Sequence, residues 1–78
     1  MDKIITDYII NEVATEKLAH IDMREELLGS GIVNSMGMMR IVLFIEKQFN
    51  VKVPPEDMTL DNFRNVEKIT QYVSSKQG

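Results

Sequence analysis

Hydrophobic residues near the start of the chain recur at three- and four-residue steps, which is the spacing of one face of an α-helix. The positions concerned are Ile4, Ile5, Tyr8, Ile9 and Val13. Leu18 extends the same stripe, and charged residues occupy several of the intervening positions. The pattern predicts a first amphipathic helix over residues 3–18.

A second helical segment, over about residues 35–49, is apolar around most of its circumference. Its apolar positions are Met36, Met38, Met39, Ile41, Val42, Leu43, Phe44, Ile45 and Phe49. Asn34 or Ser35 can supply the side-chain oxygen that caps the N-terminus of this helix. Because so small a protein cannot surround the helix completely, some of these side chains must face solvent or a partner.

Residues 20–34, between the two helical segments, are mainly polar and contain the sequence Gly29-Ser30-Gly31. This polar, glycine-containing pattern predicts a long loop, and loops of this length inside compact domains are often functional. After the second helix, residues 50–55 end in two prolines, so we expect this stretch to leave the helix and run extended.

Two further helices are expected in the last third of the chain. Thr59 or Asp61 can cap a short third helix that carries Leu60 and Phe63. A last helix is predicted by the apolar positions Val66, Ile69, Tyr72 and Val73, and it ends within residues 74–78. The chain is therefore expected to be all-α: a small four-helix bundle with a long loop between helices 1 and 2 and a short helix 3.

Composition narrows the class of protein. With 78 residues we expect one domain, residues 1–78, with a modest core and no room for a large enclosed pocket. The absence of cysteine excludes disulfides, thiolate metal sites and cysteine nucleophiles. Twelve acidic and nine basic residues give a net charge of −3, which disfavours nucleic acid as a partner. No apolar run approaches the roughly 20 residues that span a bilayer, and the N-terminus has no signal-peptide pattern, so we expect a soluble, cytoplasmic protein.

The start of the second helix offers the most specific chemistry. A hydroxyl at Ser35 would lie at the positive end of the helix dipole, just beyond a glycine-containing loop. A phosphate ester attached there would meet backbone N–H groups that have no helical partner. Taken alone, however, Ser35 could equally be a plain helix cap.

The whole-chain pattern resembles the acyl and peptidyl carrier proteins. Residues 31–37, Gly-Ile-Val-Asn-Ser-Met-Gly, resemble the family signature Gly-x-x-Asp-Ser-Leu or Asp-Ser-Met-Gly. Residues 44–54 resemble the family's hydrophobic run with Glu, Phe and then Val-Pro. Residues 55–59, Asn62-Phe63 and the closing helix over residues 66–73 also match. The resemblance covers nearly the whole chain and implies a bundle of the acyl-carrier type.

This resemblance implies a function for Ser35. The serine would accept 4′-phosphopantetheine from coenzyme A as a phosphodiester, and the terminal thiol of the arm would carry an acyl or aminoacyl group as a thioester. The protein would catalyse nothing and would present the group to biosynthetic enzymes. Its expected partners are a phosphopantetheinyl transferase, an acyl- or aminoacyl-loading ligase and a downstream transferase or synthase. A monomer without catalytic or metal-binding residues is expected.

Asn34 departs from the family pattern, which usually has Asp before the serine. Asn keeps the size and the capping oxygen of Asp but loses its charge. The change could slow modification, restrict it to a dedicated transferase, or mark a carrier that is not modified.

The second helix also predicts how partners are recognised. The resemblance places partner contacts after the serine, where fatty-acid carriers tend to be acidic. Here two cations oppose the single acid Glu46, and Gly37 stands where such carriers often have an acid. We therefore expect mainly apolar docking, as in peptidyl, aminoacyl or D-alanyl carriers, unless the charges are merely solvated. The candidate contact residues are Met36, Met38, Arg40, Leu43, Phe44 and Lys47.

Other candidate residues have simpler interpretations. The acidic cluster Glu56, Asp57 and Asp61 is expected to be solvated or to cap a helix rather than to bind metal. His20, the only histidine, has no evident catalytic partner. Met58 and Phe63 are expected to close the core beside the arm. The rival hypothesis is an unmodified adaptor that uses the apolar face of the second helix, while the absence of a catalytic set disfavours a small enzyme.

Overall fold

The structure, a computed structural model, describes residues 1–77 and is helical without strands over that range. Helix α1 spans Asp2–Tyr8, α2 spans Ser35–Phe49, α3 spans Leu60–Phe63 and α4 spans Val66–Gln77. A π-helical turn, η1, spans Ile9–Val13, and a 3-10 turn, η2, spans Pro55–Asp57. The predicted all-α fold, with its long first loop and short third helix, is confirmed.

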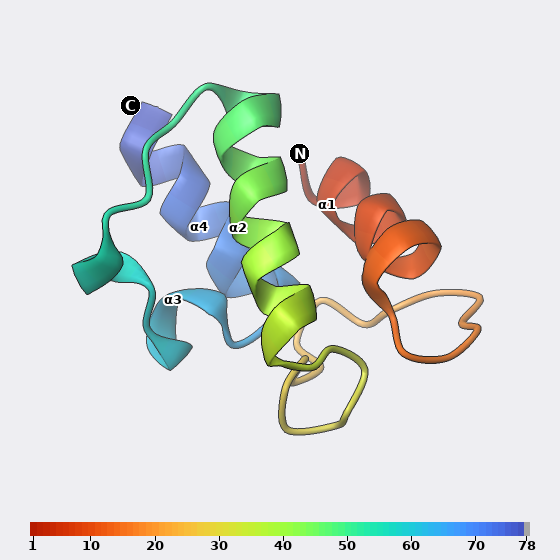
Figure 1. Ribbon diagram of the computed structural model, residues 1–78. Helices are drawn as coiled ribbons and strands as arrows, with labels where there is room; N and C mark the ends of the chain where they lie inside the picture. The colour runs from red at the N-terminus through yellow and green to blue at the C-terminus, as the bar shows by residue number, and fades with distance from the viewer. Residues whose placement is uncertain (78) are drawn as a thin grey trace.

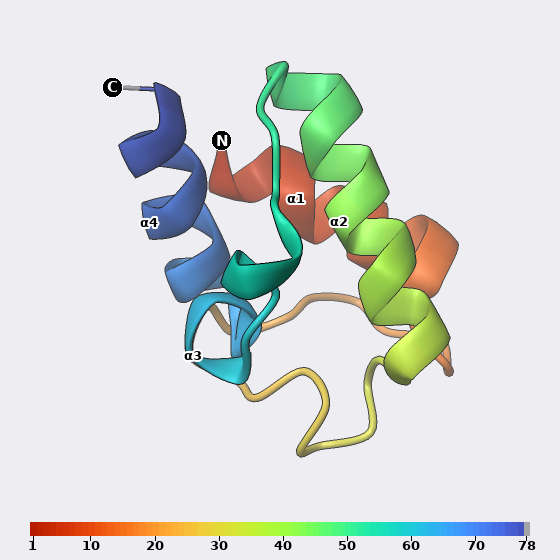
Figure 2. The same cartoon turned by 60° about the vertical axis from the view of Figure 1, so that its left-hand side comes forward.

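Helices α1, α2 and α4 contact one another pairwise around a shared core, as Figures 1 and 2 show. Short helix α3 lies at the same end of the bundle as the start of α2. The largest fully buried side chains come from α1, η1, α2, α4 and the first loop. They are Ile5, Ile9, Leu27, Ile41, Ile45, Ile69, Val33, Val66 and Val73.

The first helix ends earlier than its sequence pattern predicts. Instead of continuing to residue 18, it widens into η1 and stops at Val13, and Ala14 has an extended ψ of 139°. The stop is a tertiary effect, since the Thr15 amide donates to the Ile32 carbonyl at 2.9 Å instead of to its own helix. Leu18 still packs against the core, but from the loop.

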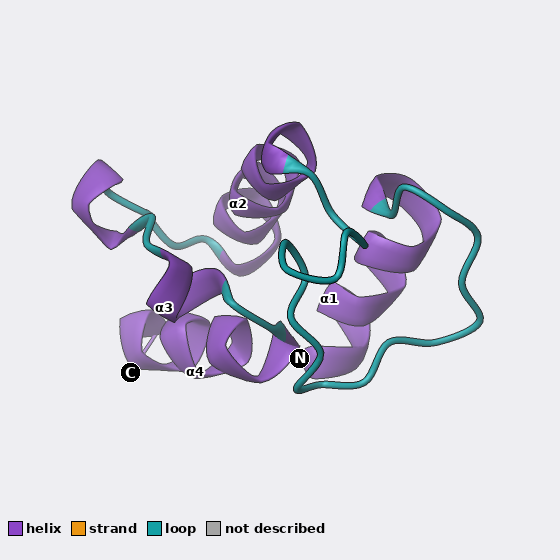
Figure 3. Ribbon diagram, turned by 90° about the horizontal axis from the view of Figure 1, so that it is seen from below, coloured by secondary structure: helices purple, strands orange, loops and turns teal. Residues whose placement is uncertain are grey.

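The loop from residue 14 to residue 34 is tied to the opposite end of the chain. The Leu27 amide donates to the Arg64 carbonyl at 2.9 Å, and the Glu67 amide donates to the Met23 carbonyl at 3.0 Å. Asn65, which is buried, accepts from the Lys68 amide at 2.8 Å and so caps the start of α4. Figure 3 shows the loop making a wide excursion beside α1 before it returns to α2.

Helix α2 ends where the sequence predicts, but the prolines are not the direct cause. Asn50 takes the left-handed conformation at φ 53°, and its amide donates to the Glu46 carbonyl. The Glu46 carboxylate then accepts from the Val53 amide at 2.9 Å. The chain therefore turns away from α2 before it reaches Pro54.

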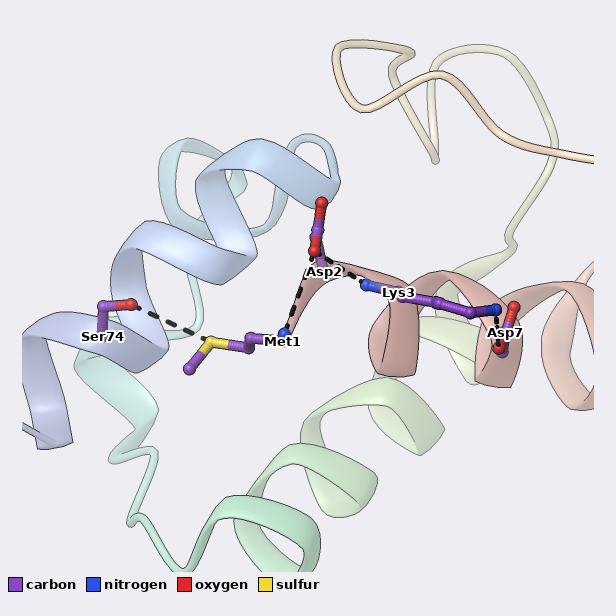
Figure 4. A network of polar contacts seen from close by, with 5 residues as sticks. All are labelled: Met1, Asp2, Lys3, Asp7 and Ser74. Atoms are coloured by element: carbon purple, nitrogen blue, oxygen red, sulfur yellow. Dashed lines mark hydrogen bonds and ion pairs between the residues drawn. The ribbon is translucent and has the colours of Figure 1, made fainter.

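The N-terminus lies against the last helix. The Ser74 hydroxyl donates to the Met1 sulfur at 3.9 Å, and Lys3 pairs with Asp7 at 3.1 Å along α1 (Figure 4). Asp2 accepts from the Lys3 amide at 3.0 Å. These contacts are exposed, so they orient the start of α1 more than they stabilise the fold.

Candidate functional site

Asn34 caps the N-terminus of α2. Its backbone is extended, and its side-chain Oδ1 accepts from the Gly37 amide at 2.7 Å. Its carbonyl accepts the first helical bond, from the Met38 amide at 2.9 Å. The predicted cap is thus confirmed and belongs to Asn34, whereas the alternative that Ser35 caps the helix is wrong. Ser35 is the first residue inside α2.

The Ser35 side chain is left exposed by this arrangement. Its hydroxyl takes part in none of the hydrogen bonds found within residues 1–77. The amides of Ser35 and Met36 lie in the first turn, where no preceding helical carbonyl can accept from them. A nucleophilic oxygen and two backbone donors therefore stand together at the positive end of a 15-residue helix.

Gly37 allows α2 to start close to η1. A Cβ atom at this position would lie 2.7 Å from Val13 Cγ1 and 3.0 Å from Val33 Cγ1, which is closer than packed carbons tolerate. Glycine therefore sets the distance between α2, η1 and the end of the loop. The sequence pattern showed Gly37 as part of the family signature and as a missing acid, but not as a packing residue, although a small residue among large apolar ones is a signal of close approach.

Thr15 holds the loop that leads to Ser35. Its hydroxyl donates to the Gly31 carbonyl at 2.7 Å, beside the Thr15 amide bond to Ile32. Gly31 has a φ of +83°, which L-residues with side chains rarely adopt. No sequence signal marked Thr15, because its partners are 16 and 17 residues away.

An apolar groove of about 210 Å³ opens beside Ser35, between α2, α3 and the first loop. Its lining residues are Leu28, Ser35, Met38, Met39, Val42, Met58, Thr59, Leu60 and Phe63. Thr59 caps α3, since its hydroxyl oxygen accepts from the Asn62 amide at 3.4 Å. Met58 and Phe63 were expected at this place, while Leu28 and Leu60 were not.

The residues expected to contact partners separate into three groups. Met36, Arg40, Leu43 and Lys47 are exposed, and Met36 is the most open of the large apolar residues at 76%. Met38 is half-buried and lines the groove. Phe44 does not belong to the outer face, because its ring stacks on Tyr8 of α1 with centroids 3.9 Å apart.

The acidic cluster does not form one site. Asp57 accepts from the Tyr72 hydroxyl at 2.7 Å and pairs with Lys76 at 3.3 Å. The hydrogen bond from Tyr72, helped by Lys76, holds the pKa of Asp57 below its ordinary value. Burial and the same bond raise the pKa of Tyr72. Glu56 and Asp61 are exposed, as is His20.

A family model described as the phosphopantetheine attachment site matches residues 7–73, which is most of the chain. The chain belongs to the phosphopantetheine-binding carrier family. This carrier is similar to D-alanyl carrier proteins of Streptococcus pyogenes, among them those of serotypes M1, M5 and M49. Each is 34% identical over 55 residues, which cover 70% of this chain and 70% of the relative.

Family membership decides between the functions that the sequence left open. The chain is a carrier and not an enzyme, its cofactor is 4′-phosphopantetheine, and it acts with transferases and ligases. The unmodified adaptor is not favoured. An exposed hydroxyl beside an apolar groove fits 4′-phosphopantetheine, which when bound supplies the thiol that this cysteine-free carrier lacks.

Within residues 1–77, no helix has both the length and the apolar character to cross a membrane.

Proposed function

We propose that Ser35 carries the 4′-phosphopantetheine and that residues 1–78 form one carrier domain. The observation that carries this proposal is the division of labour at the start of α2. Asn34 provides the cap, so the Ser35 hydroxyl stays free and exposed at the edge of the apolar groove.

Attachment requires a serine oxygen that a transferase can reach. The Ser35 oxygen would bond to the phosphorus next to pantetheine in coenzyme A as the P–O–P bond breaks; adenosine 3′,5′-bisphosphate would leave, and the hydroxyl proton would pass to a base of the transferase or to solvent. The new phosphodiester is an anion, and the first-turn amides and the dipole of α2 favour an anion at this place. Asn34 keeps these amides in position through its bond to Gly37.

The other serines of the chain already have partners. Ser30 accepts from the Ile32 amide at 3.4 Å, Ser74 donates to Met1, and Ser75 donates to the Tyr72 carbonyl at 2.8 Å. None of these three lines the groove beside α2. Ser35 is therefore the serine whose surroundings suit modification.

The cargo we propose is an amino acid or a small acyl group. The relatives reported above are named as carriers of D-alanine, one of the smallest amino acids. The groove, at about 210 Å³, is smaller than the roughly 300 Å³ at which pockets begin to enclose drug-sized ligands. Both observations favour a short cargo over a long acyl chain.

Partner enzymes are proposed to meet the carrier along α2. Met36, Arg40, Leu43 and Lys47 lie exposed on this helix and begin one residue after Ser35. Met38, inside the groove, would contact the arm rather than an enzyme. In their order of action, the proposed partners are a phosphopantetheinyl transferase, a loading ligase and a downstream transferase or synthase. We place the carrier in the cytoplasm, since its donor coenzyme A is an intracellular cofactor. That the carrier is a monomer stays a prediction.

Intact-protein mass tests the attachment site. Incubation with coenzyme A, magnesium and a broad-specificity phosphopantetheinyl transferase should add one phosphopantetheine to the parent protein. Ser35→Ala should fold and gain nothing, because the accepting oxygen is gone. Ser30→Ala removes a serine five residues earlier, on the loop before α2, and this variant should be modified like the parent. A mass gain that persists in Ser35→Ala would overturn the assignment.

A further inference from the structure

Four exposed side chains of α2 form one strip that starts beside Ser35. At 3.6 residues per turn, Met36, Arg40, Leu43 and Lys47 fall within a sector of about 60° around the helix. This sector lies opposite Ile45, which is fully buried. Met36 is 76% exposed and Leu43 is 60% exposed. The strip therefore offers two uncovered apolar side chains with a cation after each.

The strip carries positive charge without a compensating acid. Glu46 is the only acidic residue of α2, and its carboxylate is half-buried and bonded to the Val53 amide at 2.9 Å. Arg40 and Lys47 take part in none of the ion pairs found within residues 1–77. The chain as a whole has a net charge of −3, so this face differs in sign from the rest of the protein.

Stabilisation of α2 itself explains only one of the two cations. Lys47 lies in the last turn of α2, where a cation interacts favourably with the helix dipole. Arg40 lies in the middle of the helix, where the dipole gives no such benefit. Its position between two exposed apolar residues is better explained by contact with a partner, since Met and Arg are both enriched at protein interfaces.

We propose that the enzymes that act at Ser35 dock on this strip through an apolar recess bordered by acidic side chains, and that Arg40 and Lys47 select them. This inference rests on the proposed function and adds the chemistry of the partner. Met36 and Leu43 enter the recess, while the two cations pair with the acids at its rim. Complementary charge of this kind raises the rate of encounter and rejects partners whose docking surface is basic.

An enzyme fits this strip better than a membrane does. Membrane-binding basic segments usually hold four to eight clustered cations, whereas the strip has two. A membrane on this face would also cover the Ser35 hydroxyl, which must stay accessible for modification and transfer.

Charge reversal of the strip tests the proposal. We would measure kcat/KM for modification by the phosphopantetheinyl transferase of the source organism, for the parent and for the Arg40→Glu, Lys47→Glu double variant. Two exposed pairs turned from attraction to repulsion should lower kcat/KM by roughly tenfold. Added salt should lower the parent value and raise that of the variant, because it screens attraction in one and repulsion in the other.

A matched control separates local from global charge. Lys17→Glu with Lys68→Glu makes the same change in net charge at two exposed cations that lie on neither α2 nor the groove. This control should be modified at close to the parental rate. An equal loss in the control, or a rate that is unchanged or raised in the strip variant, would overturn the proposed docking.

Two further outcomes would assign the strip to another occupant. Concentration-dependent dimers that disappear in the strip variant would show a second copy of the chain as the partner. Sedimentation with phosphatidylglycerol vesicles that is lost in the same variant would show a membrane. Either result would overturn the enzyme as the partner. Absence of any modification of the parent would instead count against the function proposed for Ser35.

Discussion

Asn34 and Ser35 perform different tasks at neighbouring positions. Asn34 binds the Gly37 amide and so completes the first turn of α2, while Ser35 contributes a hydroxyl that no local bond consumes. The family pattern has Asp where this chain has Asn34. Because both residues offer the same capping oxygen, the neutral side chain preserves the geometry of the site and changes only its charge.

Substitutions at Asn34 should separate capping from charge. Asn34→Ala removes the bond to Gly37 and should reduce the free energy of unfolding by about 1 kcal/mol. Asn34→Asp keeps the bond, adds a negative charge at the positive end of α2 and should raise stability by about 0.3–1 kcal/mol. The Asp variant should also be modified faster, as the family pattern implies. Urea unfolding and the rate of mass gain measure the two effects, and an Ala variant as stable as the parent would contradict the capping role.

The elements differ in how far local sequence determines them. Helix α2 begins and ends where its pattern predicts; the cap at Asn34 was expected from the sequence, whereas the left-handed turn at Asn50 ends the helix before the prolines from which its end was predicted. The first helix stops early because Thr15 bonds across the structure to Ile32, and no neighbouring residue announces that bond. Local sequence likewise predicted only part of the groove. Ser35 could be identified from its own neighbours, whereas only the folded structure brings Leu28 and Leu60 beside it.

Substitution of Gly37 by alanine tests how closely α2 must approach η1. Helix propensity alone predicts that Gly37→Ala stabilises the protein by about 1 kcal/mol. The contact with Val13 predicts the opposite, a loss of about 1–3 kcal/mol from overpacking. We expect the loss, since Val13 and Val33 are buried and have little room to move.

Gly29→Ala is the matched control for that substitution. Its added Cβ would meet only Glu26, on an exposed loop: the Oε1 atom at 3.0 Å can swing away, and the Cβ atom at 3.3 Å needs only a small shift. Thermal unfolding should therefore place Gly29→Ala near the parent and Gly37→Ala well below it. A more stable Gly37→Ala protein would show that the close approach is not required.

At the scale of the whole molecule, Asp57 joins the segment between α2 and α3 to the last helix. Asp57 of η2 binds both Tyr72 and Lys76 of α4, and Tyr72 packs against Phe63 with ring centroids 5.5 Å apart. Phe63 in turn lines the groove beside Ser35. The contact therefore connects the stability of the α3–α4 end of the bundle with the shape of the groove.

This contact should give the protein a defined acid sensitivity. The pKa of Asp57 is lowered from 3.8 in the folded state, so its contribution to stability is present above that pH. The contribution is lost as the pH falls from 3.8 towards the lower folded pKa. Asp57→Asn should be less stable than the parent at pH 7, and the difference should shrink at pH 3. Urea unfolding at both values measures this, and an equal difference at both would contradict the assignment.

The central claim, attachment at Ser35, is tested most directly on protein isolated from the source organism. Cleavage after arginine releases residues 25–40 as one peptide, which contains both Ser30 and Ser35. Fragmentation of this peptide in the mass spectrometer locates the modified residue. We predict one phosphopantetheine, on Ser35. Phosphopantetheine on Ser30 or on another peptide, or its absence from the native protein, would contradict the claim.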